Sequence, residues 1–249
     1  MTCFRPMPPV IHLSETDSTS NYLAAHLLCE NPEEFTIVRA DYQTAGKGQR
    51  GNSWEAEAGK NLLFSILLYP KGVEARRQFL LSEAIALAIK EALDQFSSGF
   101  SIKWPNDIYW HEQKICGILL ENDLLGNTIQ KTVVGIGLNV NQQQFHSSAP
   151  NPVSLWQITR KEHDIHTLLK DITPRIIKNY TLLYSNEGAQ EISNRYHDAL
   201  FRKEGTHTYR DSAGEFKAKI ECVKPEGTLV LKDEEGKERR YAFKEVQYK

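Results

Sequence analysis

The stretch GKGQRGNSW, from Gly46 to Trp54, places three glycines, two cations and a tryptophan in one short segment. The run before it, Thr36 to Ala40, is short and β-branched, so the glycines follow a predicted strand end. Alternate glycines leave backbone N–H groups open to a ligand, while Lys47 and Arg50 supply positive charge. This composition is typical of a loop that closes over an anion, although ordinary glycine-rich surface loops share it.

Two familiar nucleotide-binding loops do not fit this stretch. A P-loop ends in Gly-Lys-Ser/Thr, which is absent here. Gly46, Gly48 and Gly51 do have the spacing of a dinucleotide-binding turn. Residues 52–59 lack the helical periodicity that must follow such a turn, and the next predicted element is a strand at Leu62 to Leu68. The sequence therefore favours a different kind of anion site.

The overall composition is that of an ordinary globular protein. The chain has 249 residues, of which 40% are hydrophobic and 25% charged, and a net charge of −2. This charge excludes a generally basic nucleic-acid binder, so DNA is not an expected partner. The four cysteines form no C-x-x-C pair, and neither a signal peptide nor a membrane span is recognisable. We therefore expect reduced thiols and a cytoplasmic location.

Periodicity predicts a domain of mixed strands and helices followed by a smaller β-domain. Helices are expected after Ser18, around Ile85 to Phe96, at Ile165 to Tyr184 and at Gln190 to Leu200. Pro174 makes the third of these either kinked or two helices. Further strands are expected at Val10 to Leu13, Ser101 to Trp104, Ile108 to Trp110, Ile115 to Leu120 and Thr132 to Val140. From Phe201 short alternating strands predict a small β-barrel, which gives domains of residues 1–200 and 201–249.

The string Lys103-Trp-Pro-Asn-Asp107 ends a predicted strand with two short polar side chains. Such a tip can hold a metal or a ribose, or it can be a plain Asx turn. Asp107 is the residue that we expect to meet magnesium, because hard cations prefer carboxylate oxygen and usually arrive with substrate phosphates. Lys114 enters the next strand from a hairpin turn, and Gly117 indicates a close approach to this backbone.

Taken in order, GKGQRGNSW, KWPND, KICGIL and GIGLNVN resemble the strings of the biotin protein ligase family. The usual family strings are close to G-R-G-R-x-G-R-x-W, K-W-P-N-D-[IL], K-[IL]-x-G-I-L and [IV]-G-I-G-[IL]-N-[VI]. The resemblance covers most of residues 10 to 141. It implies an α+β fold, with a mixed sheet flanked by helices like that of class II aminoacyl-tRNA synthetases, and an SH3-like C-terminal β-barrel.

The resemblance also implies a reaction. Biotin and ATP would form biotinyl-5′-AMP and pyrophosphate with magnesium, and a lysine of a biotin carboxyl carrier domain would then take the biotin. Carried onto matching positions, the residues expected at biotin are Ser18, Thr19, Ser20, Gln43, Gly46, Lys47, Gly48, Gln49, Lys114, Gly117 and Gly135. The nucleotide side would be formed by Arg50, Trp54, Asn106, Asp107 and Asn139, and apolar walls by Trp104, Ile118 and Leu119. Lys114, Lys47 and Arg50 are the expected catalytic cations.

The chain departs from the family pattern at three positions. Gln49 and Asn52 stand where arginines are usual, and Ser20 replaces a common asparagine. Since the first arginine helps to hold the adenylate, its loss predicts a site that leaks the activated intermediate. A catalytically weakened biotin-binding module is therefore one alternative reading.

Two further alternatives fit less well. A lipoate–protein ligase would carry Arg-Arg-x-x-Gly-Gly-Gly-x-Val and Lys-x-x-Gly-Ser-Ala strings, which are absent. A biotin-responsive repressor would need a helix-turn-helix domain, for which the residues before Val10 leave no room. A homodimer is left open by the sequence.

Overall fold

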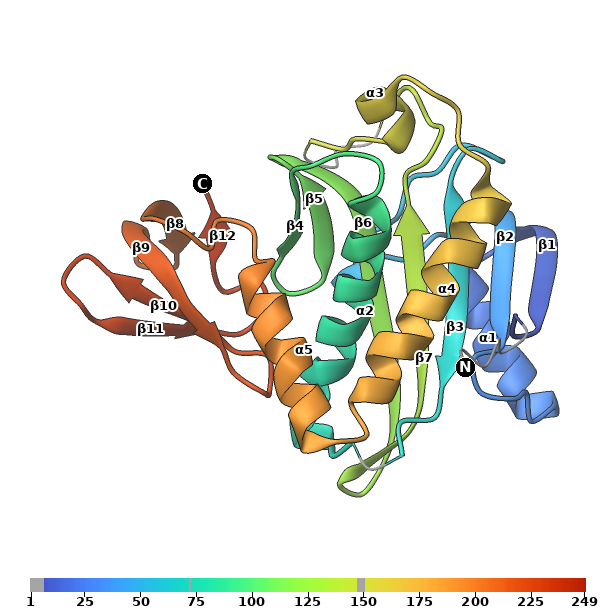
Figure 1. Ribbon diagram of the computed structural model, residues 1–249, viewed down its shortest axis with the longest axis horizontal. Helices are drawn as coiled ribbons and strands as arrows, with labels where there is room; N and C mark the ends of the chain where they lie inside the picture. Colours follow the sequence, from blue (N-terminus) through green and yellow to red (C-terminus); the bar gives the residue numbers. More distant parts are fainter. Residues whose placement is uncertain (1–6, 72, 147–150) are drawn as a thin grey trace.

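The computed structural model describes residues 7–71, 73–146 and 151–249, with only the backbone of Arg50. Its larger sheet has seven strands in the order β1-β2-β3-β7-β6-β5-β4 (Figure 1). β1 runs parallel to β2, and all the other neighbouring strands of this sheet pair antiparallel. The strands are β1 Val10–Thr16, β2 Ile37–Gln43, β3 Leu62–Leu68, β4 Phe100–Lys103, β5 Asp107–Trp110, β6 Gln113–Leu125 and β7 Thr128–Leu138.

Helices cover both faces of this sheet. α1 (Thr19–Cys29) packs on β2, β3 and β7, and Leu23 closes a small apolar cluster beneath it. The other face carries α2 (Phe79–Leu93), α4 (Ile165–Leu182) and α5 (Asn186–Asp198), which lie side by side in Figure 1. β3 is buried along its whole length, because its successive residues point to opposite faces of the sheet and helices cover both faces. The predicted mixed sheet flanked by helices is confirmed.

Several boundaries differ from those expected. α4 continues through Pro174 as one helix, which settles the choice between one helix and two. α5 begins at Asn186 rather than Gln190, because Ser185 caps it by accepting from the backbone N–H of Gly188. A short helix, α3 (Leu155–Thr159), was not expected. Its capping box joins Ser154 and Gln157. The described part of residues 1–200 also contains two 3-10 turns, η1 (Gln49–Gly51) and η2 (Ala75–Arg77).

A second, antiparallel sheet stands where the small β-domain was expected. Its strands are β8 His207–Asp211, β9 Gly214–Val223, β10 Leu229–Asp233, β11 Glu238–Tyr241 and β12 Gln247–Tyr248, in the order β11-β10-β9-β8-β12. The indole N–H of Trp104 donates to the carbonyl of Gly227 at 2.9 Å, and its ring lies edge-on to Phe243. Trp104 therefore joins the two sheets, at the cis Trp104–Pro105 peptide.

The structure describes three of the four cysteines and shows no disulfide between them. Cys29, Cys116 and Cys222 are free thiols, and Cys3 lies outside the described residues. Burial raises the pKa of the Cys116 thiol, which therefore stays protonated. No helix in the described part of the chain is long and apolar enough to span a membrane.

Candidate functional site

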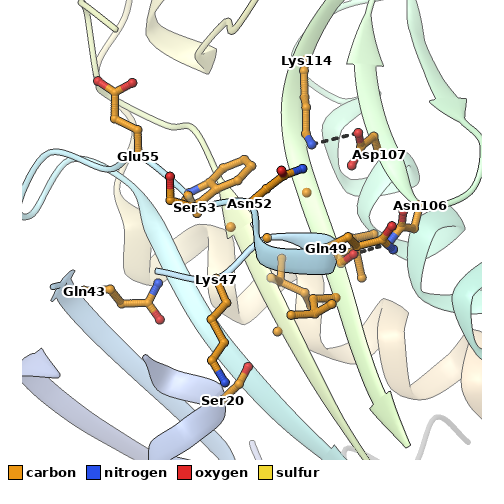
Figure 2. A pocket seen from close by; sticks show the side chains of 18 of the residues that line it. Ser20, Gln43, Lys47, Gln49, Asn52, Ser53, Glu55, Asn106, Asp107 and Lys114 are labelled. Carbon is orange, nitrogen blue, oxygen red and sulfur yellow. Dashed lines mark hydrogen bonds and ion pairs between the residues drawn. The ribbon is translucent and has the colours of Figure 1, made fainter. Parts of the chain in front are cut away.

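A pocket of about 570 Å³ lies between the start of α1, the glycine-rich loop and strands β5 to β7. Gly117, Gly135 and Gly137 form part of its floor, where β6 and β7 pair. The absence of side chains at these positions allows other groups to approach the sheet closely. Figure 2 shows polar side chains entering the pocket from both sides of this floor.

One end of the pocket is a cluster of hydroxyl groups at the start of α1. Ser18, Thr19 and Ser20 are all buried there. The backbone N–H and the hydroxyl of Thr19 both donate to Oε1 of Gln43, at 2.7 and 3.0 Å. Oγ of Ser65, on β3, lies 2.8 Å from Oγ1 of Thr19 and 2.9 Å from Oγ of Ser20. This end can bind a small ligand with several hydrogen-bonding atoms.

Gly135 is needed for the cluster to pack against the sheet. A Cβ atom at this position would lie 2.6 Å from Oγ of Ser20. A side chain would thus displace the Ser20 hydroxyl from its place beside Ser65. Gly135 acts on the ligand end of the pocket by admitting Ser20.

The glycine-rich loop folds back on itself over the pocket. Gly48 N–H donates to Asn52 O at 2.7 Å, and Trp54 N–H donates to Gly46 O at 2.9 Å. Gly46 has to be small, because a Cβ there would lie 2.9 Å from the carbonyl oxygen of Trp54. These bonds make the loop a small closed hairpin, with η1 at its tip.

Trp54 ends this hairpin and places its indole on the glycine floor. A Cβ at Gly117 would lie 2.8 Å from its ring, and one at Gly137 only 2.5 Å. Nζ of Lys114 lies 5.6 Å from the ring centroid, which is within cation–π range. The loop therefore lies on β6 and β7, and β6 also carries Lys114.

That cationic end is built from Lys114 and Asp107. Nζ of Lys114 lies 2.8 Å from Oδ2 of Asp107, and both side chains are about one quarter exposed (Figure 2). Asn106 is buried beside them and donates its amide to Ile118 O. The pairing keeps the ammonium group oriented without removing it from the pocket.

Lys47 lies on the opposite side of the pocket. Figure 2 shows its side chain directed toward Ser20, away from Lys114. Its Nζ donates to the side-chain oxygen of Asn21 and lies 4.0 Å from Glu121. Asn21 in turn donates to Asp17, and that bond is the main cause of the lowered pKa of the Asp17 carboxyl. Lys47 thus links the loop to α1.

A third region lies near Asn139, Phe145, Pro152 and Phe243. Nδ2 of Asn139 donates to Val153 O at 3.0 Å. Its Oδ1 is buried and has no partner among the described residues, and the same holds for Oε1 of Gln49 and Nε1 of Trp54. Buried polar atoms of this kind are unfavourable unless something satisfies them. All three residues line the pocket. A ligand that bonds to these atoms, or a movement of the loop that gives them partners, would therefore stabilise the protein.

Residues 13–139 match the model of the biotin/lipoate A/B protein ligase family. The chain belongs to this family. A biotin–[acetyl-CoA-carboxylase] ligase of Paracoccus denitrificans is 30% identical over 233 residues, covering 91% of this chain and 95% of that protein. The bifunctional ligase/repressor BirA of Bacillus subtilis is 29% identical, over 92% of this chain and 70% of its own length.

Among solved structures of the family, the biotin protein ligase of Aquifex aeolicus in complex with biotin and ATP is similar in fold. Its TM-score is 0.80 at 28% sequence identity, and the match covers 97% of this chain and 99% of that one. The likeness extends over both sheets of the present structure, since it spans nearly the whole chain.

Most residues expected from the ligase motifs come together in this one pocket. Its lining includes Ser18, Thr19, Ser20, Gln43, Lys47, Gly48, Gln49, Trp54, Asn106, Asp107, Lys114, Gly117, Ile118, Leu119, Gly135 and Asn139. Gly46 lies just outside the lining and shapes the loop instead. The backbone of Arg50 is in η1, and its side chain is outside the described residues. Trp104 does not line the pocket, because it is packed between the two sheets.

Some residues at the site were not expected from the motifs. Ser65 is fully buried beneath the hydroxyl cluster. Gln142 is also buried: it accepts from Asn61 and from the Glu57 backbone and donates to Gln144 O at 2.8 Å. These bonds tie the segment after the glycine-rich loop to the end of β7. Phe243 reaches the pocket from the second sheet. Each is a lone residue outside a motif, so no local pattern marks it.

Proposed function

We infer that the chain is a biotin protein ligase, which makes biotinyl-5′-AMP from biotin and ATP and then biotinylates a carrier-protein lysine. One observation carries this inference. A single pocket under the glycine-rich loop holds the hydroxyl cluster at one end and Lys114, paired with Asp107, at the other. The structure of the Aquifex enzyme contains both biotin and ATP, and the Paracoccus relative is named as a ligase acting on acetyl-CoA carboxylase.

The first step joins a carboxylate to a phosphate, and both are anions. A carboxylate oxygen of biotin attacks the α-phosphorus of ATP, and the bond to the bridging oxygen breaks to release pyrophosphate. We propose that Lys114 stabilises the charge that builds on the phosphate oxygens. Asp107 keeps the ammonium group of Lys114 oriented, so the lysine needs little reorganisation when the reaction occurs.

The second step transfers the biotin acyl group. A neutral amine of the carrier lysine attacks the acyl carbon, AMP leaves, and the extra proton of the new amide passes to solvent. The loop that carries Trp54 covers the mixed anhydride between these steps and excludes water from it. Lys47 and Gly48 would contact the adenylate from the loop side.

Magnesium fits this site only as a partner of ATP. The described residues contain no group of three or more His, Cys, Asp or Glu side chains that could hold a metal. Mg²⁺ commonly uses one or two carboxylates together with substrate phosphates. We propose that Asp107 would supply the carboxylate for magnesium, which would neutralise charge on the phosphates.

The two ends of the pocket take different parts of the substrates. Ser18, Thr19, Ser20 and Gln43 would bind the ureido ring of biotin, since they offer several hydrogen-bonding groups. Asn106 and Asn139, with the rings of Trp54 and Phe243, would form the nucleotide end. We also propose that residues 1–200 and 201–249 are separate domains and that the enzyme acts in the cytoplasm on a biotin carboxyl carrier domain.

Exchange of labelled pyrophosphate into ATP tests the first step. The wild-type protein should catalyse exchange only when biotin and magnesium are present. Lipoic acid should not replace biotin, because its dithiolane ring offers no N–H or C=O group to the hydroxyl cluster. Exchange that depends on lipoate instead would assign the chain to the lipoate branch of the family and contradict the proposal.

A further inference from the structure

The hydrogen bonds beneath the start of α1 have one consistent direction. The backbone N–H of Thr19 can only donate, and it lies 2.7 Å from the side-chain amide of Gln43. The atom that faces it must therefore be the amide oxygen, which fixes the orientation of the Gln43 side chain. Its amide nitrogen is left on the other side of the group.

This direction passes along three hydroxyl groups. Oγ1 of Thr19 lies 3.0 Å from the same amide oxygen, which carries no hydrogen, so the Thr19 hydroxyl donates to it. A hydroxyl has one hydrogen, so Thr19 accepts from Ser65 at 2.8 Å. Ser65 has then used its own hydrogen and accepts from Ser20 at 2.9 Å. The three side chains are buried, which strengthens the hydrogen bonds between them.

The consequence appears at the two ends that line the pocket. Ser20 has already given its hydrogen to Ser65, so its oxygen offers only lone pairs to a ligand. Gln43 has used its oxygen, so it offers only the N–H groups of its amide. Ser65 is fully buried and does not line the pocket, yet it sets what Ser20 presents.

We propose that Ser65 is a positioning residue, which makes Ser20 an obligatory acceptor for an N–H group of a cyclic urea. The proposal rests on the proposed function, because the ureido ring of biotin carries two N–H donors and one carbonyl acceptor. Gln43 would donate to that carbonyl. Ser20 replaces the asparagine that is common in the family. An asparagine side chain carries its own donor and acceptor, whereas the serine depends on Ser65.

Binding calorimetry with isosteric analogues tests the direction of the chain. The probes are biotin and the two cyclic carbamates in which one ring N–H is replaced by oxygen. The wild-type protein should bind one carbamate about 30-fold more weakly than biotin, because an acceptor then faces the Ser20 oxygen. In Ser65→Ala, the Ser20 hydroxyl can turn and donate. Biotin should bind about tenfold more weakly, and the preference over that carbamate should fall to about threefold.

Thr132→Val is the matched control. Thr132 is also a fully buried hydroxyl of the same sheet, and it donates to Asn122 away from the pocket. This variant should keep both the biotin affinity and the preference of the wild type. If Ser65→Ala does not fold, Ser20→Ala should remove the preference in the same way.

The possible failures are distinguishable. A preference for biotin over that one carbamate that is unchanged in Ser65→Ala or in Ser20→Ala would overturn the directed chain, even with biotin bound. A wild-type protein that binds biotin and both carbamates equally would overturn it too. If wild-type protein does not bind biotin at all, the proposed function fails, and this inference fails with it.

Discussion

Lys114 is placed by a hairpin that brings two motifs together. β5 and β6 pair so that Asp107 faces Gly117 across the ladder, and the lysine side chain returns toward the carboxylate. Lys114→Met removes the charge but keeps the aliphatic stem. We expect adenylate formation to fall about 10²- to 10³-fold, as when one preorganised donor is lost from a charged transition state. Pyrophosphate exchange measures it.

Lys131→Met is the control for this change. Lys131 pairs with Asp123 at 3.2 Å on the neighbouring strand and does not line the pocket. Its loss should leave the exchange rate within about twofold of wild type, as is usual for exposed ion pairs. Equal losses of activity in the two variants would mean that Lys114 acts only on stability.

Gln49 is the second residue whose chemistry can be tested directly. Its Oε1 is buried without a partner among the described residues, and it stands where the family most often has arginine. Gln49→Arg would add charged donors beside the adenylate phosphate. Charge-assisted bonds of this kind should slow release of biotinyl-5′-AMP about tenfold or more. Release can be followed by rapid filtration of the labelled adenylate. An unchanged release rate would contradict a leak at this position.

The motifs marked most of the polar residues that line the pocket, because each lies in a short string with an unusual composition. KWPND and KICGIL marked Asp107 and Lys114 separately, but their ion pair was not predicted. Ser65 was not predicted, because it is the one polar residue in the apolar run Leu62–Leu68 and its partners are 45 and 46 residues away in sequence. Trp104 was misplaced for a similar reason, since no local pattern shows that a second sheet covers it.

At the scale of elements, the glycine-rich loop depends on the floor beneath it. Gly137→Ala would place a methyl group 2.5 Å from Trp54, so the indole would have to leave the sheet. We expect faster hydrolysis of the adenylate and easier proteolysis of the loop, while biotin binding changes little. The increase over wild type in iodide quenching of the tryptophan fluorescence measures the added exposure of the ring.

A double-mutant cycle separates this effect from a general loss of stability. Trp54→Ala alone should increase adenylate hydrolysis in the same way as Gly137→Ala. The combined variant should be no worse than Trp54→Ala, because the two changes act through one contact. Additive effects would show that Gly137 does not act through Trp54.

α2 and α5 meet at a buried carboxyl group that responds to pH. Glu83 accepts from the hydroxyl of Ser193 at 2.6 Å, and burial raises its pKa from 4.5 to about 7. The folded state therefore holds this proton more tightly than the unfolded chain does. The resulting stability is complete below about pH 4.5 and is lost as pH rises through 7.

Glu83→Gln removes this dependence and keeps an acceptor for Ser193. Its free energy of unfolding should exceed that of wild type by up to about 3 kcal/mol above pH 7, with no gain near pH 4.5. Urea denaturation across this range measures the difference. A gain that is the same at every pH would contradict the assigned titration.

Element boundaries were less predictable than element types. Pro174 lies inside one continuous helix, since the neighbouring α2 and the core hold α4 together. Asn186 to Ala189 have little apolar periodicity, so only the Ser185 cap marks the true start of α5. Tertiary packing decided the first case, and a local pattern does not contain it. The second case depended on a single capping residue.

At the scale of the whole molecule, the second sheet completes the pocket from outside the motif region. Phe243 lines the end of the pocket that we propose for the nucleotide, and the turn at Gly227 accepts a hydrogen bond from Trp104, which follows β4 of the larger sheet. Gly227 has a φ of +94°, and a Cβ there would lie 2.8 Å from the ring of Phe79. Gly227→Ala should therefore loosen the sheet and raise the KM for ATP severalfold, with biotin affinity unchanged.

Gly236→Ala provides the matched control for that variant. Gly236 has a similar φ of +82°, but a Cβ there would meet nothing within 4 Å. Both substitutions carry the cost of a left-handed backbone, and only one disturbs the contact with Phe79 of α2. If the KM for ATP rises equally in both variants, docking of the sheet does not contribute to the nucleotide site.

The sequence indicated a small β-domain from its turn spacing, and the second sheet agrees with it. Where that sheet docks could not be derived in the same way. The contacts join Trp104 to Gly227 and Phe243, more than 100 residues apart, and neither partner lies in a recognisable string. These long-range contacts depend on how the surfaces of the two sheets fit together, which cannot be derived from composition or local pattern.

The most direct measurement of the central claim is intact-protein mass spectrometry of a carrier domain. The protein is mixed with biotin, magnesium-ATP and a biotin carboxyl carrier domain, with lipoic acid in a parallel reaction. The account predicts one biotin added to one carrier lysine, and no addition from lipoic acid or to a carrier with that lysine changed to arginine. An unmodified carrier, or one modified only by lipoic acid, would contradict it.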